Sequence, residues 1–135
     1  MSMTIILGGS GYIGRNLFAE LGPKRAQASY HNTPLEDGFR FDAATMALHE
    51  TGIDTTGSTH CVILSGITSP DFCFKNRVEA DAVNITGIKR IIDDVLALGL
   101  IPVFASTEAV FDGSRGNYDE TDAANPILVY GQQKL

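Results

Sequence analysis

The chain has 135 residues, of which 44% are hydrophobic, and its 10 basic and 16 acidic side chains give a formal net charge of −6. This length accommodates one domain with a hydrophobic core and is too short for two. The acidic groups are scattered and no basic stripe runs along the chain, which argues against a nucleic acid partner. No charged and apolar leader opens the chain, and no apolar run approaches the about 18 residues that span a bilayer, so we expect a cytoplasmic protein without a membrane partner.

The cysteines and histidines carry no metal signature. Cys61 lies within an expected buried strand and Cys73 ahead of an expected helix, which predicts reduced thiols and no disulfide framework. His31, His49 and His60 stand at no ligand spacing from one another or from a cysteine. We therefore expect no metal site.

A glycine-rich turn near the start of the chain carries the first functional signal. The apolar run Ile5–Leu7 predicts a strand, and it breaks into a turn over Gly8–Gly14 and a helix start. Glycines at every third position allow a sharp turn, close approach of a pyrophosphate and tight packing of the helix on its strand. These glycines are Gly8, Gly11 and Gly14. The first helical turn, with the amides of Tyr12, Ile13 and Gly14, then forms an anion site. The pattern predicts a dinucleotide-binding turn, and a plain structural turn is the alternative.

The end of the second expected strand bears on cofactor choice. The first helix is expected to stop at Gly22-Pro23, and a second strand follows over 26–30. In dinucleotide folds this strand end carries an acidic residue for the adenosine ribose or a basic one for a 2′-phosphate. The residues here are Tyr30, His31 and Asn32. None is acidic and none is arginine, which slightly favours NADP(H) over NAD, with a polar turn as the alternative.

Two further segments are expected at the same edge of the sheet. Residues 39–42 alternate in the manner of a short strand that ends at Asp42. Asp42 either accepts a hydrogen bond from an adenine amine or caps a helix over 43–50. The apolar run 61–64 is typical of a central parallel strand, and the small residues Ser65 and Gly66 that close it leave room for a ligand.

A long helix over 76–98 and a fifth strand over 101–105 complete the pattern. Apolar residues at helical spacing predict a core stripe of Val78, Ala82, Ile85, Ile88, Ile92 and Val95. Asn84 and Gly87 lower the helix propensity, which indicates either a group that passes closely or tight helix packing. The order of elements predicts an α/β fold, with a Rossmann-type doubly wound parallel sheet and right-handed crossovers.

The end of the chain carries the chemical signal. The fifth strand runs into Thr107, and Asn125-Pro126 fit the cap and first position of a last helix. On that helix Tyr130 and Lys134 share one face. A neighbouring ammonium lowers the pKa of a phenol, which is about 10 when unperturbed. Tyr130 could then donate a proton to a forming alkoxide while Thr107 holds the carbonyl oxygen. Taken alone, this spacing is more often an ordinary exposed helix pair.

Together these pieces resemble the extended short-chain dehydrogenase/reductase family, and within it the dTDP-4-dehydrorhamnose reductase-like branch. The matching motifs cover nearly the whole chain and comprise the glycine turn, Asp42, Val83-Asn84, the segment 106–113, Tyr118-x-Glu120-Thr121-Asp122, Pro126 and Tyr130-Gly131-x-x-Lys134-Leu135. The resemblance implies that Tyr130 is the general acid, with Thr107 as its hydroxyl partner. It also implies that Lys134 lowers the pKa of Tyr130 and holds the nicotinamide ribose. The expected cofactor-binding residues are Gly8, Gly11, Tyr12, Ile13, Gly14, His31, Asp42, Ser65 and Gly66.

Some positions depart from the family pattern. Glu108 and Ala109 stand where family members often carry aspartate and tyrosine, and Ser65-Gly66 where they carry an alanine pair. These departures concern the substrate and not the cofactor. Relatives run to about twice this length, with a substrate domain after the tyrosine helix. We therefore expect residues 1–135 to form an NAD(P)-binding Rossmann domain, truncated before the substrate domain.

The sequence thus predicts the cofactor-binding half of an NAD(P)-dependent reductase of a nucleotide-activated keto sugar. The first alternative is a non-catalytic dinucleotide-binding subunit that resembles the regulatory partner of methionine adenosyltransferase. The second alternative is an NAD-dependent epimerase or dehydratase of sugar nucleotides. The expected partners are a nucleotide-sugar substrate and either a second copy of the chain or the C-terminal half found in relatives.

Overall fold

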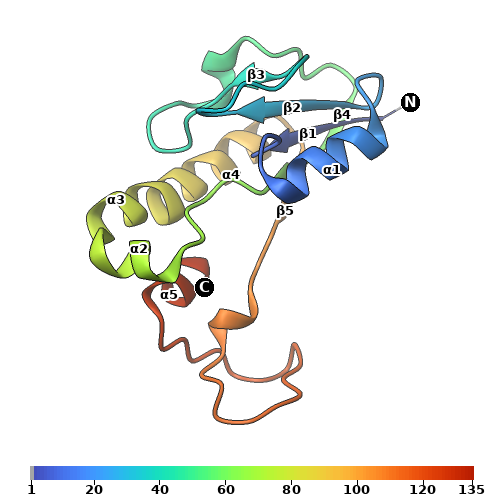
Figure 1. The fold of residues 1–135 in the computed structure, drawn as a ribbon. Helices are drawn as coiled ribbons and strands as arrows, with labels where there is room; N and C mark the ends of the chain where they lie inside the picture. Colours follow the sequence, from blue (N-terminus) through green and yellow to red (C-terminus); the bar gives the residue numbers. More distant parts are fainter. Residues whose placement is uncertain (1) are drawn as a thin grey trace. The chain divides into compact units, whose positions relative to one another are not determined.

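The computed structural model describes residues 2–135 and contains a parallel sheet of five strands (Figure 1). The strands are β1 Met3–Leu7, β2 Ala26–Tyr30, β3 Phe39–Arg40, β4 Ser58–Ile63 and β5 Ile101–Phe104. Their order across the sheet is β3-β2-β1-β4-β5, and every neighbouring pair is parallel. This is the strand order of a dinucleotide-binding sheet, which confirms the predicted fold class.

The described chain divides into two compact units. The sheet unit comprises the residues up to Gly66 together with Gly87–Ala105, and it holds all five strands. The tyrosine unit comprises Ile67–Thr86 and Ser106–Leu135. Each unit is described by itself below.

The core of the sheet unit lies on its central strands. Ile5, Ile6 and Leu7 of β1 are fully buried, as are Cys61 and Ile63 of β4. Such burial on both faces is typical of a central parallel strand. Helix α1, Tyr12–Leu21, packs Leu17, Phe18 and Leu21 against the cluster of Ile6, Ala26 and Ala28. The predicted first helix and second strand are therefore confirmed, and Gly22 ends the helix with a φ of 72°.

The predicted helix over 43–50 is wrong. The side chain of Asp42 instead caps a turn, because its Oδ1 accepts the N–H of Ala44 at 2.9 Å. A short 3-10 turn follows over Leu48–Thr51. Leu48 is fully buried, and its N–H donates to Oδ2 of Asp94 at 2.8 Å. Asp94 lies in α4, Ile88–Ala97, so a tertiary contact replaces the helical hydrogen bond that the local sequence favoured.

The predicted long helix is present but divided. It comprises α3, Arg77–Asp81, a π-helical segment, Ala82–Gly87, and α4, and a further helix, α2, precedes it over Pro70–Lys75. The predicted core stripe is correct at Ile88 and Val95 but wrong at Val78, which is 88% exposed, and at Ala82, which is also exposed. A π turn holds more residues than an α turn and so shifts the buried face. The buried positions of α3 and the π-helical segment are therefore Ala80, Asn84 and Gly87.

The last helix, α5, begins later than predicted and spans only Val129–Lys134. Asn125, the expected cap, is used elsewhere. Its N–H donates to the carbonyl oxygen of Val110 at 2.9 Å, and its side chain donates to Oδ2 of Asp112 at 3.1 Å. The predicted fifth strand is confirmed over Ile101–Phe104. No helix in the described part of the chain has the length and hydropathy of a membrane span.

Candidate functional site

The glycine turn of the sheet unit is shaped by contacts that exclude any side chain. A Cβ at Gly14 would overlap the carbonyl oxygen of Gly8, which lies at the end of β1. A Cβ at Gly9 would lie 2.6 Å from that of Ala28, and Gly8 has a φ of +92°. The obstacles at Gly14 and Gly9 are parts of the sheet unit's own backbone and core. The glycine spacing is thus required to lay α1 on the sheet.

The N-terminus of α1 has the properties of an anion site. Its N-cap, Gly11, has no side-chain cap, and the first turn contains no acidic residue. The N–H groups of a first helical turn have no preceding turn to accept their hydrogen bonds. Tyr12 and Ile13 in this turn are 88% and 65% exposed. The α1 N-terminus therefore combines backbone N–H groups that have no acceptor within the helix with the positive end of the helix dipole.

A buried serine anchors this turn to the neighbouring strand. Ser29 of β2 is 2% exposed, its Oγ accepts the N–H of Gly8 at 2.9 Å, and its carbonyl accepts the N–H of Ser10 at 3.2 Å. Sequence analysis missed Ser29, because nothing local distinguishes a serine that bonds another strand from one on the surface. The contact holds the turn while leaving the amides of the first helical turn open.

The end of β2 carries more positive charge than the sequence indicated. His31 Nε2 lies 3.6 Å from Oδ2 of Asp42. Arg40 of β3 pairs with Tyr30 in the parallel register and is exposed. Sequence analysis sought a basic residue directly after β2 and missed Arg40, which belongs to the next strand. The parallel pairing of residues 29–30 in β2 with residues 39–40 in β3 places Arg40 beside the end of β2.

The pKa of Asp42 reflects this surrounding. Burial raises the pKa, but hydrogen bonds from Ala44 and Thr45 and the positive charges of His31 and Arg40 together bring it below its usual value. Asp42 is therefore a carboxylate at neutral pH. It keeps acceptor capacity beside the capping bond to Ala44.

The ends of β1 and β4 meet at the same edge of the sheet. A Cβ at Gly8 would lie 2.8 Å from the backbone nitrogen of Ser65, so the glycine turn passes directly against the end of β4. The strand order reverses between these two strands, which is where open α/β sheets bind ligands. The sheet unit thus gathers the predicted cofactor residues at one edge, from the glycine turn through His31 and Asp42 to Ser65 and Gly66.

The tyrosine unit brings Tyr130 and Thr107 together. The two side chains share a hydrogen bond, and the one hydroxyl hydrogen of Thr107 is donated to Oε2 of Glu108 at 3.1 Å. A Cβ at Gly131 would overlap the carbonyl oxygen of Ala109. Helix α5 therefore lies so close to the turn Glu108–Val110 that only glycine fits at position 131. This close packing places Tyr130 beside Thr107.

The pKa of Tyr130 differs from the sequence expectation. Burial raises it, a hydrogen bond with Thr107 lowers it, and the negative charge of Glu108 raises it further, so the pKa lies above its ordinary value. The predicted lowering is therefore wrong for this arrangement. Lys134 is half-buried, and burial lowers the pKa of its ammonium group. The phenol is consequently protonated at neutral pH and able to donate.

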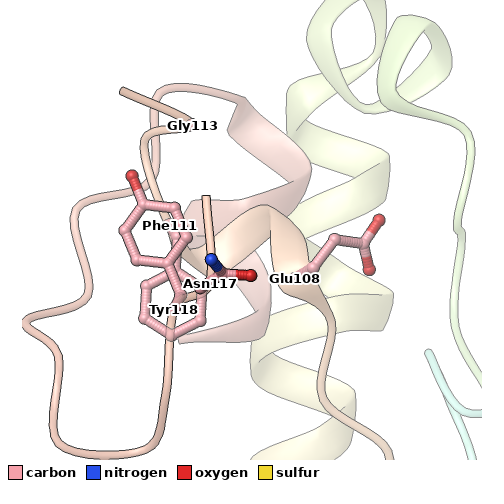
Figure 2. A pocket seen from close by; sticks show the side chains of 5 residues that line it. All are labelled: Glu108, Phe111, Gly113, Asn117 and Tyr118. Atoms are coloured by element: carbon pink, nitrogen blue, oxygen red, sulfur yellow. The ribbon is translucent and has the colours of Figure 1, made fainter. Parts of the chain in front are cut away.

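A cavity of about 400 Å³ lies in the loop that follows Thr107 (Figure 2). It is lined by Glu108, Phe111, Gly113, Asn117 and Tyr118. The rings of Phe111 and Tyr118 stack at 4.5 Å, and the Tyr118 hydroxyl donates to Oδ1 of Asp112 at 2.6 Å. Figure 2 shows Glu108 directed away from the stacked rings. These contacts order the loop that leads from Thr107 to α5.

Among residues 2–135 no group of three histidine, cysteine, aspartate or glutamate side chains is arranged to hold a metal ion. Cys61 and Cys73 are both buried and free. Burial raises the pKa of Cys61 to about 12, so this thiol stays protonated.

Comparison with known proteins gives consistent matches along the chain. The profile of the family described as RmlD substrate binding domain matches residues 2–135. The dTDP-4-dehydrorhamnose reductase of Sinorhizobium fredii is 33% identical over 96 residues, which is 70% of this chain and 32% of that protein. The methionine adenosyltransferase 2 subunit beta of Bos taurus is 25% identical over 143 residues, which is 97% of this chain and 40% of that protein.

Solved structures show the same relationship. A hypothetical dTDP-4-dehydrorhamnose reductase from Sulfolobus tokodaii has a TM-score of 0.88 and 28% identity, over 98% of this chain and 49% of that one. The dTDP-4-dehydrorhamnose reductase of Bacillus anthracis in complex with NADP has a TM-score of 0.79 and 26% identity, over 99% of this chain and 47% of that one. The chain therefore spans less than half the length of each of these relatives.

Proposed function

Because the chain belongs to the RmlD substrate binding domain family, we propose that it is the dinucleotide-binding part of an NAD(P)-dependent reductase of a nucleotide-activated keto sugar. The single observation that carries the proposal is the packing of Gly131 against Ala109, which pairs a protonated Tyr130 with Thr107. A phenol paired with a hydroxyl suits proton transfer to a carbonyl oxygen. The dTDP-4-dehydrorhamnose reductases among its relatives support the substrate class.

The residues at the edge of the sheet unit fit a dinucleotide. The glycine turn holds the N-terminus of α1 close to the sheet, and the amides of Tyr12 and Ile13 there would receive the pyrophosphate. Asp42 would accept a hydrogen bond from the adenine amine, and the small residues at 65 and 66 leave room at the strand end. The Bacillus anthracis relative, solved in complex with NADP, supports this assignment.

Basic groups near the end of β2 favour NADP(H). Arg40, opposite Tyr30, and His31 are basic residues at the end of β2, the strand end that contacts the adenosine ribose in dinucleotide folds. An arginine recognises a phosphate by charge and by paired N–H donors. We therefore assign the 2′-phosphate to Arg40 and His31.

Proton transfer is the part of the reaction that falls to the tyrosine unit. When bound, a reduced nicotinamide dinucleotide supplies the hydride that reaches the carbonyl carbon. Tyr130 donates its proton to the oxygen, which becomes the hydroxyl of the product, and the resulting phenolate recovers a proton from solvent. Thr107 hydrogen-bonds the Tyr130 oxygen, and the Lys134 ammonium offers positive charge as the phenolate forms.

Titration of NADP⁺ and NAD⁺ against the chain tests the binding part of the proposal. Binding at a hundred times Kd stabilises the folded state by about 2.7 kcal/mol, which thermal shift detects. The matched control is Gly116→Ala, since a Cβ at Gly116 meets no atom within 4 Å. We expect stabilisation of the parent chain and of this control, and none of Gly14→Ala. Absence of stabilisation of the parent by either dinucleotide, well above ~1 mM, contradicts the proposal.

Turnover tests the chemical part. In a full-length form that carries the substrate domain found in relatives, we expect NADPH or NADH to be oxidised in the presence of a dTDP-4-keto-6-deoxy sugar, and Tyr130→Phe to remove this activity. Undiminished turnover in the phenylalanine variant would exclude Tyr130 as the proton donor.

One observation favours a second candidate function, a non-catalytic dinucleotide-binding subunit. The match to methionine adenosyltransferase 2 subunit beta covers 97% of the chain at 25% identity. Capture of a methionine adenosyltransferase catalytic subunit at stoichiometric ratio, together with no turnover of any sugar nucleotide, would favour this candidate over the reductase.

A further inference from the structure

A chain of buried polar side chains within the tyrosine unit has no role in the proton transfer described above. Asn84 is 2% exposed and Gln133 is 6% exposed. The side chain of Asn84 accepts the N–H of Ile67 at 2.8 Å and donates to its carbonyl oxygen at 2.9 Å. It also donates to Oε1 of Gln133 at 2.9 Å, and Nε2 of Gln133 donates to Oδ1 of Asp81 at 2.8 Å.

These contacts give every nitrogen and oxygen of the two carboxamides at least one partner. The two hydrogens of Asn84 Nδ2 go to Ile67 and Gln133, and both ends of the Gln133 carboxamide have a partner. A buried polar group that loses its partner is costly, because no water replaces the hydrogen bond. A rotation of α5 that moved Gln133 away would therefore leave a buried N–H of the Asn84 side chain without its hydrogen-bond acceptor. The contacts accordingly define one orientation of α5.

Helix α5 needs such a constraint because it is short. It has six residues, and a helix of this length is marginal without tertiary contacts. It packs beside α2 (Figure 1). Because Gly131 has no side chain, α5 can lie close to Ala109. A glycine contact, however, has no side-chain donor or acceptor that selects one rotation about the helix axis. The Gln133 carboxamide supplies that selection.

The partner of Gln133 lies at an unusual point of the chain. Asn84 belongs to the π-helical segment Ala82–Gly87, and π turns are frequent at functional sites. Asp81, the other partner, is held by Arg77 at 3.6 Å on the same helix. Gln133 thus connects α5 to the point where α3 ends and the π-helical segment begins.

We propose that Gln133 is a positioning residue, whose hydrogen bonds to Asn84 and Asp81 set the rotation of α5 and hold the Tyr130 hydroxyl against Thr107. Tyr130 and Gln133 are three positions apart on one helix, so they occupy neighbouring positions on its surface. The functional importance of the contact rests on the proposed role of Tyr130 as proton donor. The contact itself requires neither cofactor nor substrate.

A double-mutant cycle on the full chain tests the inference. The readout is the NMR chemical shift of the Tyr130 Cζ at neutral pH, which responds to hydrogen bonding of the hydroxyl, with Tyr130→Phe identifying the resonance. We expect Thr107→Val to move this shift in the parent chain and to have no effect in the Gln133→Leu background. Gln132→Leu, which alters an exposed neighbour on the same helix, should leave the Thr107→Val effect intact.

The milder variant Gln133→Asn covers the case in which Gln133→Leu does not fold. It keeps the carboxamide but shortens its reach, so it should also abolish the Thr107→Val effect. An equal Thr107→Val effect in the parent and in either Gln133 background overturns the inference. Because no dinucleotide is present, this result is separable from a failure of the proposed function, which the titration and turnover experiments detect.

Discussion

The two units of the chain hold their candidate residues by different physical means. In the sheet unit, the glycine turn is shaped by backbone sterics over a fully buried strand, and few alternatives to glycine exist. In the tyrosine unit, a six-residue helix is held by a close glycine contact and by buried carboxamides. The turn is therefore a local consequence of its sequence, whereas the position of Tyr130 depends on partners far along the chain.

The largest expected effect is that of Gly14→Ala in the sheet unit. The new Cβ overlaps the Gly8 carbonyl, and backbone on both sides cannot yield without moving α1 from the sheet. Overpacking of this kind costs about 3 kcal/mol or more of unfolding free energy. Chemical denaturation measures the loss, with Gly116→Ala as the control of unchanged stability. If the Gly14→Ala chain were as stable as the parent and bound dinucleotide normally, the conclusion that steric contacts require glycine in this turn would be wrong.

Gly131→Ala in the tyrosine unit should lower the free energy of unfolding by less than Gly14→Ala does in the sheet unit. Its Cβ overlaps the Ala109 carbonyl, but α5 can shift away because it is short. We expect a loss of about 1–3 kcal/mol. Hydrogen exchange should show weaker protection in α5 and unchanged protection in β1. Equal loss of protection in both elements would mean that the two units unfold as one.

Arg40→Gln tests the charge at the end of β2. Loss of one charge-assisted hydrogen bond to a phosphate costs about 1.5–3 kcal/mol, which corresponds to roughly a tenfold or greater rise in the Kd for NADP⁺. The Kd for NAD⁺, which lacks the 2′-phosphate, should stay the same. Lys24→Gln, at the opposite end of β2, is the matched control. Equal weakening of both cofactors would assign Arg40 a structural role instead.

The smallest expected effect concerns Asp42. Its pKa is lower in the folded chain than in the unfolded chain, so its carboxylate stabilises the fold above the unfolded pKa of about 3.9. This contribution is lost as pH falls through the folded pKa. The stability difference between the parent and Asp42→Asn should therefore be present at pH 7 and shrink below about pH 4. Denaturation midpoints across this range measure it, and a difference that does not change with pH would contradict the assignment.

Local steric and periodic signals account for what could be predicted. Apolar runs identified β1 and β4, the position after the helix stop at Gly22-Pro23 and the one after the long helix identified β2 and β5, and the family resemblance follows from motifs that are contiguous in sequence. The helix predicted over 43–50 failed because Leu48 bonds Asp94, a partner 46 positions away. The last helix was placed too early because Asn125 bonds Val110 and Asp112 instead of capping.

By itself the sequence determined the glycine turn, the order of the strands and the identity of the paired residues Thr107 and Tyr130, since each rests on side-chain size or on spacing along one element. Only the tertiary structure decided that Arg40 lies opposite Tyr30, that the pKa of Tyr130 rises with burial, and that Gln133 is bound between Asn84 and Asp81. These facts depend on register and burial between distant segments. The spacing of residues along the chain does not determine strand register or burial.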